Sequence, residues 1–563
     1  MLNSALVCAL RFSLSQPREE RPPWDSDGND SYDCEMTLTS FSSSRVRRPQ
    51  VSRVPPVVLP LALLGVTFAL TRSASIDDAY ISYRYAANLA AGRGLVLNVG
   101  ERVEGISNML WTLALSLAHL AAVPLPVAGS ALGLLSVAGS VLLTDRLCRR
   151  LGAPPVVALL TACSVAVTTD VVAGATMGLE GGLFGALLLL VLLSWDASGP
   201  TFALGVIALG ATRPEGLAIG AVLAVLRLAM PLGEPRTRWW PVLGIAGLGG
   251  VELARLALFG RLLPTSVTAK RDIGLSPLTS LRLHGRDGLA YLVHRAGVPA
   301  LVAAVVLVVA LVLARRRVVA TIGADLVPAV VVLLAGALLP VLSGGDWMPY
   351  SRLIAPYFPV GYVAVAVVLA RTGGQRAIAV AAVVPLVLAA VGHHELPLRD
   401  NGRTALDTDR GFDRLGRALE HVGAASGARG VLATDVLGRP CFWAPSRRCS
   451  DILGLAEPAI AGRPGPGSVY GKTDYAYTLS LRPAVLATDT WPRLRDILAV
   501  ARGGSVSYVA VESQSLTRDR VFVLADTATA GPLRDALRRS GDRGVLIAPA
   551  GSAFAVWDSA VVG

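Results

Sequence analysis

The chain has 563 residues, of which 53% are hydrophobic and only 16% charged, a balance that excludes an ordinary soluble enzyme. The formal net charge of +12 rests on 52 basic residues, and only two of these, Lys270 and Lys472, are lysines. No basic face interleaved with aromatic residues accompanies this charge. Nucleic acid is therefore not an expected partner.

Apolar segments of a length near that needed to cross about 30 Å of hydrocarbon recur between residues 54 and 392. Four arginines between Arg45 and Arg53 precede the first segment, so the N-terminus is expected on the cytoplasmic side. Later arginine clusters also fall inside if Asn108–Val123 is an interfacial helix instead of a crossing. The pattern predicts a multi-pass protein of the cytoplasmic (inner) membrane, with about eleven transmembrane helices and an outward C-terminus.

Changes in amino-acid composition divide the chain into three regions. Residues 1–53 are rich in Ser, Pro and Arg and are expected to form a disordered cytoplasmic segment. Residues 54–392 form the membrane domain. From residue 393 the hydropathy falls, helical spacing covers 411–425, and short apolar runs follow at 430–434, 506–511 and 543–548. We expect 393–563 to be an extracytoplasmic α/β domain that could bind the acceptor or another carbohydrate.

With this topology, polar residues concentrate on the outer loops. The candidate site residues there are Asp77, Asp78, Arg84, Glu104, Asn108, Glu180, Arg213, Glu215, Lys270, Asp346, Trp347 and Arg352. The adjacent carboxylates Asp77 and Asp78 follow the first apolar segment directly. Like charges beside lipid are costly to keep unless they are used, so this pair is the first candidate for catalysis.

An outward site at the bilayer has no access to soluble nucleotide sugars, but it can reach a lipid-linked donor. A polyprenyl-phosphate leaving group needs cations such as Arg213, Lys270 or Arg352 to stabilise its developing charge. The acceptor hydroxyl of a glycan needs a positioned carboxylate as base. One carboxylate of Asp77-Asp78 would serve as base, and the other could hold a sugar hydroxyl or a divalent cation.

Several of these residues also have a purely structural explanation. Arg84 could anchor an amphipathic helix at the interface, Glu104 could be a plain loop charge, and Glu180 could cap a helix. Arg213 and Glu215 could form a local ion pair at a helix that begins at Pro214. Glu252 and Arg255, three residues apart within one apolar segment, are expected to form a structural ion pair.

The motifs on the predicted outer loops resemble those of a known enzyme family. The segment 77–111, DDAYISYRYAANLAAGRGLVLNVGERVEGISNMLW, resembles the first outer loop of the mycobacterial terminal β-arabinofuranosyltransferases, which are GT-C membrane glycosyltransferases. The likeness continues, in the same order, through MGLEGGLF (177–184), TRPEG (212–216), FGRLLPTSVTAK (259–270), GGDWMPYSRLIAP (344–356), TDVLGRPCFW (434–443) and DILGLAEPAIA (451–461).

The resemblance implies a GT-C fold, a decaprenyl-phosphoryl arabinofuranose donor and an arabinan acceptor of the cell envelope. It also implies that the catalytic base is Asp77 or Asp78. The segment 463–477 lacks the His-Glu-Lys triplet expected of close relatives, and 259–270 lacks an Asn-Thr-Tyr-Tyr stretch. Both departures lie where an acceptor could bind, so they leave the identity of the sugar open.

A transporter or lipid-linked-sugar flippase is the competing class, because it would also be polytopic and rich in small apolar residues. Transporters place ionisable residues near the bilayer midplane, often in two repeated halves. In this sequence the charges gather on the outer loops and no repeat is evident. A sugar-binding membrane sensor without turnover is a third possibility.

Cys441 and Cys449 lie close together in the predicted outer tail, separated by a segment with Pro445 and two adjacent arginines that suggests a turn. An outward compartment allows disulfides to persist. We expect these two cysteines to be bridged, whereas no pattern of Cys and His residues indicates a zinc site.

Overall fold

The computed structural model describes most of the chain from Pro55 onward. The described residues are 55–71, 75–197, 199–230, 238–314, 323–391, 401–426, 430–468, 470–501, 507–542 and 544–550. The expected disordered segment 1–53 and the predicted boundary at residues 392 and 393 lie outside them. By backbone contacts, the chain from Pro55 to Gly563 forms one compact unit.

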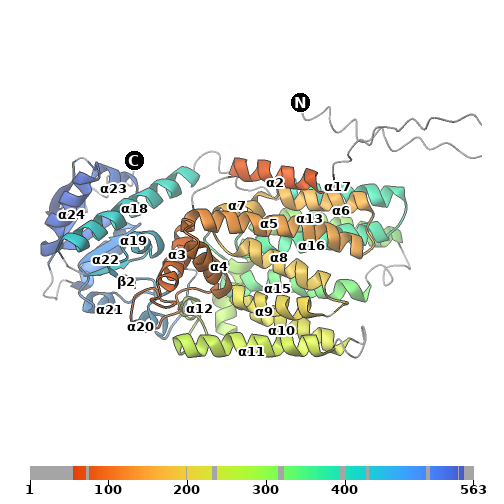
Figure 1. The fold of residues 1–563 in the computed structure, drawn as a ribbon, viewed down its shortest axis with the longest axis horizontal. Coiled ribbons are helices and arrows are strands. Elements are labelled where there is room, and N and C mark those ends of the chain that lie inside the picture. The colour runs from red at the N-terminus through yellow and green to blue at the C-terminus, as the bar shows by residue number, and fades with distance from the viewer. Residues whose placement is uncertain are drawn as a thin grey trace, which may run out of the picture. The chain divides into compact units, whose positions relative to one another are not determined.

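The part of the chain before residue 392 is helical (Figure 1). Its helices are α2 (Val58–Thr71), α3 (Asp77–Ala90), α4 (Met109–Leu120), α5 (Leu125–Arg150), α6 (Pro155–Val167), α7 (Thr169–Thr176), α8 (Gly181–Leu193), α9 (Pro200–Thr212), α10 (Pro214–Ala229), α11 (Trp239–Phe259), α12 (Thr265–Lys270), α13 (Pro277–Ala314), η3 (Ala324–Leu326), α15 (Val327–Ser343), η4 (Ala355–Tyr357), α16 (Phe358–Arg371) and α17 (Gln375–Val391).

Small residues let these helices pack closely. A Cβ at Gly133 of α5 would lie 2.7 Å from the Cα of Ala175 in α7, and one at Gly185 of α8 would lie 3.0 Å from the carbonyl oxygen of Pro356. Membrane helices associate through such close backbone approaches, because lipid provides no hydrophobic drive between them. The core of this part is accordingly built from buried Ala, Val and Leu side chains of α5, α6, α8 and α16.

Among the described residues, three helical stretches are long and apolar enough to cross a membrane: α5, α11 and the stretch from η3 through α15. The pair α6 and α7 would make a fourth, bent by 58° between its halves. Other apolar helices in the described chain have 10–17 residues, and α4, in the segment expected to be interfacial, has 12. These findings indicate a membrane protein, while the number of eleven crossings stays a prediction.

The tail carries a mixed six-stranded sheet, as the expected α/β character requires. Its strand order is β2-β1-β3-β5-β4-β6, with β2-β1-β3 parallel and the other pairs antiparallel. The strands are β1 (Val431–Thr434), β2 (Arg448–Asp451), β3 (Val485–Thr488), β4 (Tyr508–Glu512), β5 (Phe522–Asp526) and β6 (Leu546–Pro549). The helices are α18 (Asn401–Ser426), α19 (Gly438–Trp443), α20 (Pro458–Ala461), α21 (Tyr475–Ser480), α22 (Trp491–Ala501), α23 (Gln514–Arg518) and α24 (Thr527–Arg539).

The sheet and the first loop, residues 77–111, share one hydrophobic core. Tyr85 of α3 and Leu97 and Ile106 of the following loop are buried together with side chains of α18, α19 and the sheet, such as Phe412 and Leu432. Burial of apolar area is the main favourable term in folding. The first loop is therefore part of the folded tail as much as of the helical part.

Cys441 of α19 and Cys449 of β2 form a disulfide, with their Cα atoms 6.1 Å apart. We expect mass mapping of unreduced protein to find both cysteines in one linked peptide. In the chain-entropy estimate, a bridge closing so small a loop stabilises by roughly 2–3 kcal/mol. Replacing both with serine should therefore lower the melting temperature. Full alkylation of both thiols in fresh, unreduced membranes would contradict the bridge.

Candidate functional site

Asp77 and Asp78 form the first turn of α3, directly after Ile76 in extended conformation. Carboxylates are favoured there because the unpaired N–H groups and the helix dipole place positive charge at this end. Successive side chains on a helix point about 100° apart, so the two neighbours meet different surroundings. The structure assigns them different partners.

Asp77 binds the tail. The backbone N–H groups of Gly438 and Arg439, at the start of α19, donate to its two carboxylate oxygens at 2.9 and 2.6 Å. A Cβ at Gly438 would overlap the backbone carbonyl of Asp77, so only glycine permits this approach. With both oxygens engaged in capping α19, Asp77 is poorly placed to act as a base. We therefore retain Asp78 alone as the candidate base.

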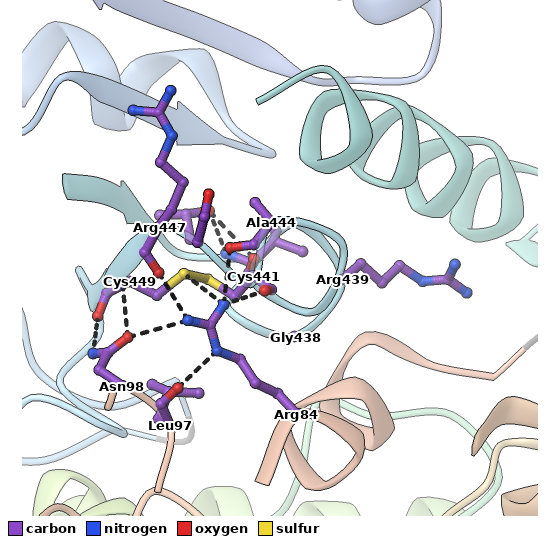
Figure 2. Close-up of a disulfide and its surroundings, with 12 residues drawn as sticks. Arg84, Leu97, Asn98, Gly438, Arg439, Cys441, Ala444, Arg447 and Cys449 are labelled. Atoms are coloured by element: carbon purple, nitrogen blue, oxygen red, sulfur yellow. Dashed lines mark hydrogen bonds between the residues drawn. A yellow bond between two sulfur atoms is a disulfide. The ribbon is translucent and has the colours of Figure 1, made fainter. Parts of the chain in front are cut away.

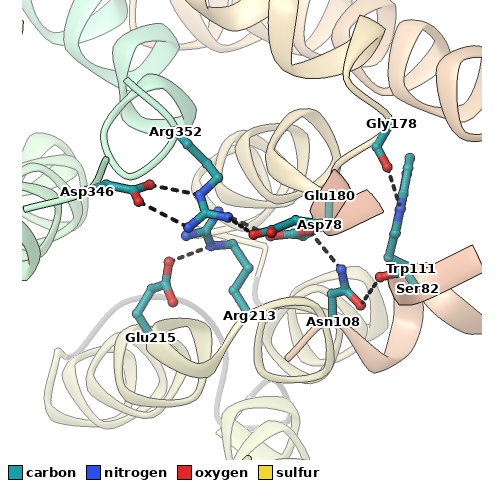
Figure 3. A network of polar contacts seen from close by, with 10 residues as sticks. All are labelled: Asp78, Ser82, Asn108, Trp111, Gly178, Glu180, Arg213, Glu215, Asp346 and Arg352. Carbon is teal, nitrogen blue, oxygen red and sulfur yellow. Dashed lines mark hydrogen bonds and ion pairs between the residues drawn. The ribbon is translucent and has the colours of Figure 1, made fainter. Parts of the chain in front are cut away.

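Asp78 faces a cluster of charged residues at the other side of α3. Arg352 donates from Nη1 to Asp78 Oδ2 at 3.0 Å, and it binds both oxygens of Asp346 at 2.9 and 3.3 Å. Figure 3 shows the Arg352 guanidinium between the two carboxylates. The Asp78 side chain is 29% exposed. In the described chain no hydrogen bond reaches its Oδ1, which is left available to a ligand.

Arg352 is held by a turn that needs two glycines. Gly344 and Gly345 have φ of 77° and 88°, in the left-handed region, and the turn aims the buried carboxylate of Asp346 at Arg352. Burial opposes the charge of Arg352, but Asp346 and Asp78 outweigh it, so the pKa of Arg352 is raised. The guanidinium thus stays charged and fixed beside Asp78 at any working pH.

A second polar chain continues from α3 into the helical part (Figure 3). Ser82 donates to Asn108 Oδ1 at 3.1 Å, and Asn108 Nδ2 donates to Glu180 at 2.9 Å. Arg213 donates to Glu180 at 3.3 Å and to Glu215 at 2.5 Å. Arg213 is the last residue before α10, which begins at Pro214, so the expected helix start and local ion pair are both present. Glu180 precedes α8 but makes no side-chain cap.

Lys270 differs from the arginines around it. It ends α12, and none of the described residues forms a hydrogen bond or ion pair with its ammonium group. Its half-buried side chain lies close enough to Arg352, Asp346, Asp78 and Arg213 to feel their charges. Burial, and then Arg352, lower the pKa of Lys270, with the carboxylates opposing this. The cluster therefore contains one cation whose hydrogen-bond donors are unused in the described chain.

Arg84 does not join this cluster. It is 5% exposed and donates to the carbonyl oxygens of Leu97 at 2.7 Å, Arg447 at 2.8 Å and Cys441. Figure 2 shows its guanidinium pointing into the loop closed by the disulfide. Burial lowers the pKa of Arg84 to about 10. Its N–H groups already bind carbonyl oxygens of the tail and of Leu97. We therefore assign Arg84 a structural role in place of the expected role in binding the sugar donor.

Glu104 is also placed elsewhere. Its buried carboxylate accepts from Arg255 Nε of α11 at 2.9 Å, and Arg255 also pairs with Glu252 as expected. The backbone of Glu104 accepts from Thr265 N at 2.9 Å, which fixes the start of α12. These contacts place Glu104 between the first loop and α11 and α12, so we no longer count it as a ligand contact.

A cavity opens beside Arg352, and sequence reasoning did not predict it. Its walls come from α5, α7, α8 and the segment around η4. They are mostly apolar or small, and they include Asp170, Gly181, Gly182, Gly185 and Pro356. The signal available in the sequence was the glycine spacing of GGLFG, which leaves one face of α8 without side chains. The cavity is small, with room for about one water molecule, and Arg352 is its contact with the charged cluster.

In the part of the chain that the structure describes, no three His, Cys, Asp or Glu side chains come together as a metal site would require. Arginines separate the four carboxylates of the cluster, which are Asp78, Glu180, Glu215 and Asp346. A divalent cation has no ready set of ligands here, and we do not include one in the proposal below.

Comparison with known proteins adds little beyond this geometry. No protein-family model and no curated protein matches the chain. Among solved structures the chain is similar to ArnT from Cupriavidus metallidurans in the apo state. The TM-score is 0.44 and the identity 14%, with 84% of this chain and 98% of that chain covered. A TM-score below 0.5 is too low to support an argument, so the function is argued from the site.

The adjacent carboxylates provide a matched pair of variants. Asp78→Asn should lower turnover of a lipid-linked sugar by about 10²–10⁴-fold, the usual cost of losing a general base, with little change in melting temperature. Asp77→Asn leaves one acceptor oxygen for the two N–H groups of α19, so it should cost about 1–3 kcal/mol and lower the melting temperature while keeping most turnover. The assignment fails if Asp77→Asn is the inactive variant and Asp78→Asn is not.

Proposed function

We propose that this chain is a membrane glycosyltransferase that uses a polyprenyl-phosphate sugar as donor. The acceptor is a glycan of the cell envelope, and transfer takes place on the outer face of the cytoplasmic membrane. One observation carries the proposal: Asp78, a partly exposed carboxylate with one oxygen that accepts no hydrogen bond in the described chain, lies in one cluster with Lys270, whose ammonium donors are unused there. A base and a phosphate-binding charge side by side are what this transfer requires.

Asp78 would act through Oδ1. An acceptor hydroxyl placed there gives its proton to Asp78 as its oxygen forms a bond to the anomeric carbon of the donor sugar. The bond from that carbon to the phosphate oxygen breaks, and the electron pair leaves with the polyprenyl phosphate. Arg352 donates to Oδ2 at 3.0 Å, which fixes the orientation of the carboxylate.

The leaving phosphate would bind at Lys270. Arg352 is already matched by Asp78 and Asp346, and Arg213 by Glu180 and Glu215. An additional anion in the cluster therefore has one described cation left to pair with. Charge-assisted hydrogen bonds to phosphate are about twice as strong as neutral ones, and they strengthen as negative charge develops on the leaving group.

The donor's polyprenyl chain would stay in the bilayer beside the helical part, whose exposed side chains include many large apolar ones. For the sugar we propose arabinofuranose, with arabinan as acceptor, on the strength of the motifs at 77–111, 212–216 and 344–356. These motifs contain Asp346 and residues of the first loop, which also form part of the charged cluster.

The direct test is a transfer assay. Purified protein in detergent or nanodiscs should transfer arabinofuranose from a synthetic polyprenyl phosphate to an arabinan oligosaccharide, extending it by one residue detectable by mass. Other polyprenyl-phosphate sugars assayed in parallel test the sugar separately. Transfer of a different sugar would contradict the choice of arabinofuranose, but it would still support transfer from a polyprenyl-phosphate donor. Flipping of the donor across vesicles without any product would favour a flippase instead.

Lys270 predicts a pH dependence. Because the pKa of Lys270 is lowered from its ordinary 10.5, its charge is lost as the pH rises through that lowered value. kcat/KM for the donor should fall there, since only the charged form binds phosphate. Lys270→Arg should keep kcat/KM level through the same range, because arginine stays protonated. Lys270→Met should lose roughly 10–100-fold at neutral pH, the cost of one charged hydrogen bond.

The pH profile separates this role from a purely structural one. A Lys270 that only supports the fold would lower stability when replaced, and the alkaline limb of the remaining activity would not move. An unchanged alkaline limb in Lys270→Arg contradicts phosphate binding at this residue.

A further inference from the structure

Two exposed aromatic rings meet outside the charged cluster. Trp347 is 45% exposed and Tyr470 is 50% exposed, and their ring centroids lie 5.9 Å apart with the planes tilted by 30°. They come from segments more than a hundred residues apart in the sequence. Large aromatic rings left in solvent lose the burial that would stabilise them, so a pair held together at a surface suggests a ligand.

The segment that carries Tyr470 is fixed to the loop after Lys270. Gly465 and Ile273 exchange backbone hydrogen bonds of 2.9 and 3.0 Å, and Gly467 N donates to Asp272 at 2.8 Å. A Cβ at Gly467 would overlap the backbone carbonyl of Lys270. Tyr470 is thereby anchored next to the end of α12.

Trp347 is fixed from the other side of the same cluster. It directly follows Asp346, whose carboxylate is bound to Arg352, and Arg352 in turn binds Asp78. The turn of Gly344 and Gly345 sets the direction of this segment. The two rings therefore adjoin the candidate base and the candidate phosphate cation through short, rigid connections.

A surface groove continues from Tyr470 along the tail. Its lining includes Arg463, Ser468, Lys472, Thr473 and Arg493. Hydroxyl groups and backbone carbonyls beside an aromatic ring are suited to a sugar, which has a flat apolar face and hydroxyls at its edge.

The cations of the groove have partners inside the protein. Arg463 pairs with Asp474, and Arg493 pairs with Asp435. Lys472 Nζ donates to the carbonyl oxygens of Arg463 at 2.8 Å and Ala461 at 3.4 Å. The groove thus has little free positive charge to recruit an anionic polymer, and a neutral chain is the better match.

We propose that Trp347 and Tyr470 form the platform on which the acceptor, a neutral oligosaccharide, stacks its sugar rings, with the groove beyond Tyr470 holding the following residues of the glycan. This deepens the proposed function, on which it rests, by assigning the acceptor subsite. The platform would present the terminal sugar's hydroxyl toward Asp78.

Binding without turnover tests the platform. An arabinofuranose oligosaccharide is titrated into the purified full chain, with no donor present, and binding is followed by calorimetry. Trp347→Ala and Tyr470→Ala should each weaken binding roughly tenfold, the order expected for one aromatic contact. Tyr470→Phe should bind as the native chain does, because stacking does not need the hydroxyl. Trp239→Ala, which removes an exposed tryptophan on α11, is the matched control and should have no effect.

The outcomes separate this proposal from the one on which it rests. Unchanged binding in both alanine variants, with melting temperatures like that of the native chain, would overturn the platform. So would failure of the native chain to bind any neutral oligosaccharide of a panel. Either result leaves transfer from the lipid donor to be decided by the transfer assay. If an alanine variant is unstable, loss of binding in a folded Tyr470→Leu variant, with binding kept in Tyr470→Phe, decides the question.

Discussion

The site depends on the contact between α3 and the loop 438–449 of the tail. Asp77 at the start of α3 caps α19, and Arg84, two turns later, fills the loop that the disulfide closes. The partly buried carboxylate of Asp77 and the buried guanidinium of Arg84 both bind backbone atoms of this loop, so neither can leave without exposing unpaired polar groups. This double attachment fixes the rotation of α3, and the rotation of α3 determines where Asp78 points.

Pairing of charges then decides which groups remain available. The cluster holds four carboxylates and two arginines, each arginine pairs with two of the carboxylates, and these pairs position Asp78 with little freedom. What stays available to a ligand is one oxygen of Asp78 and the ammonium of Lys270. A rigid frame of satisfied charges around a few unsatisfied ones is the arrangement that electrostatic catalysis requires, because the frame need not reorganise during the reaction.

Much of the architecture was predictable because its signals are local. Apolar runs indicated the helical part, and the short apolar runs at 430–434, 506–511 and 543–548 correspond to β1, β4 and β6. Strand β2 was missed because Arg448, Ser450 and Asp451 are polar. It is nevertheless largely buried, since Asp451 accepts backbone hydrogen bonds from Leu453 and Ala456. Strands β3 and β5 were also not predicted, although their residues are mostly apolar and buried.

The sequence by itself determined that charged residues gather in the loops between apolar segments, that two adjacent carboxylates follow the first of these segments, and that the tail is an α/β part. Only the tertiary structure decided that Asp77 caps α19 while Asp78 faces Arg352, that Arg84 belongs to the tail, and that Trp347 meets Tyr470. Hydrophobic pattern and helix propensity act between residues a few positions apart. Pairing of charges and rings acts between segments separated by tens to hundreds of residues, and it is settled only when packing fixes the direction of each side chain.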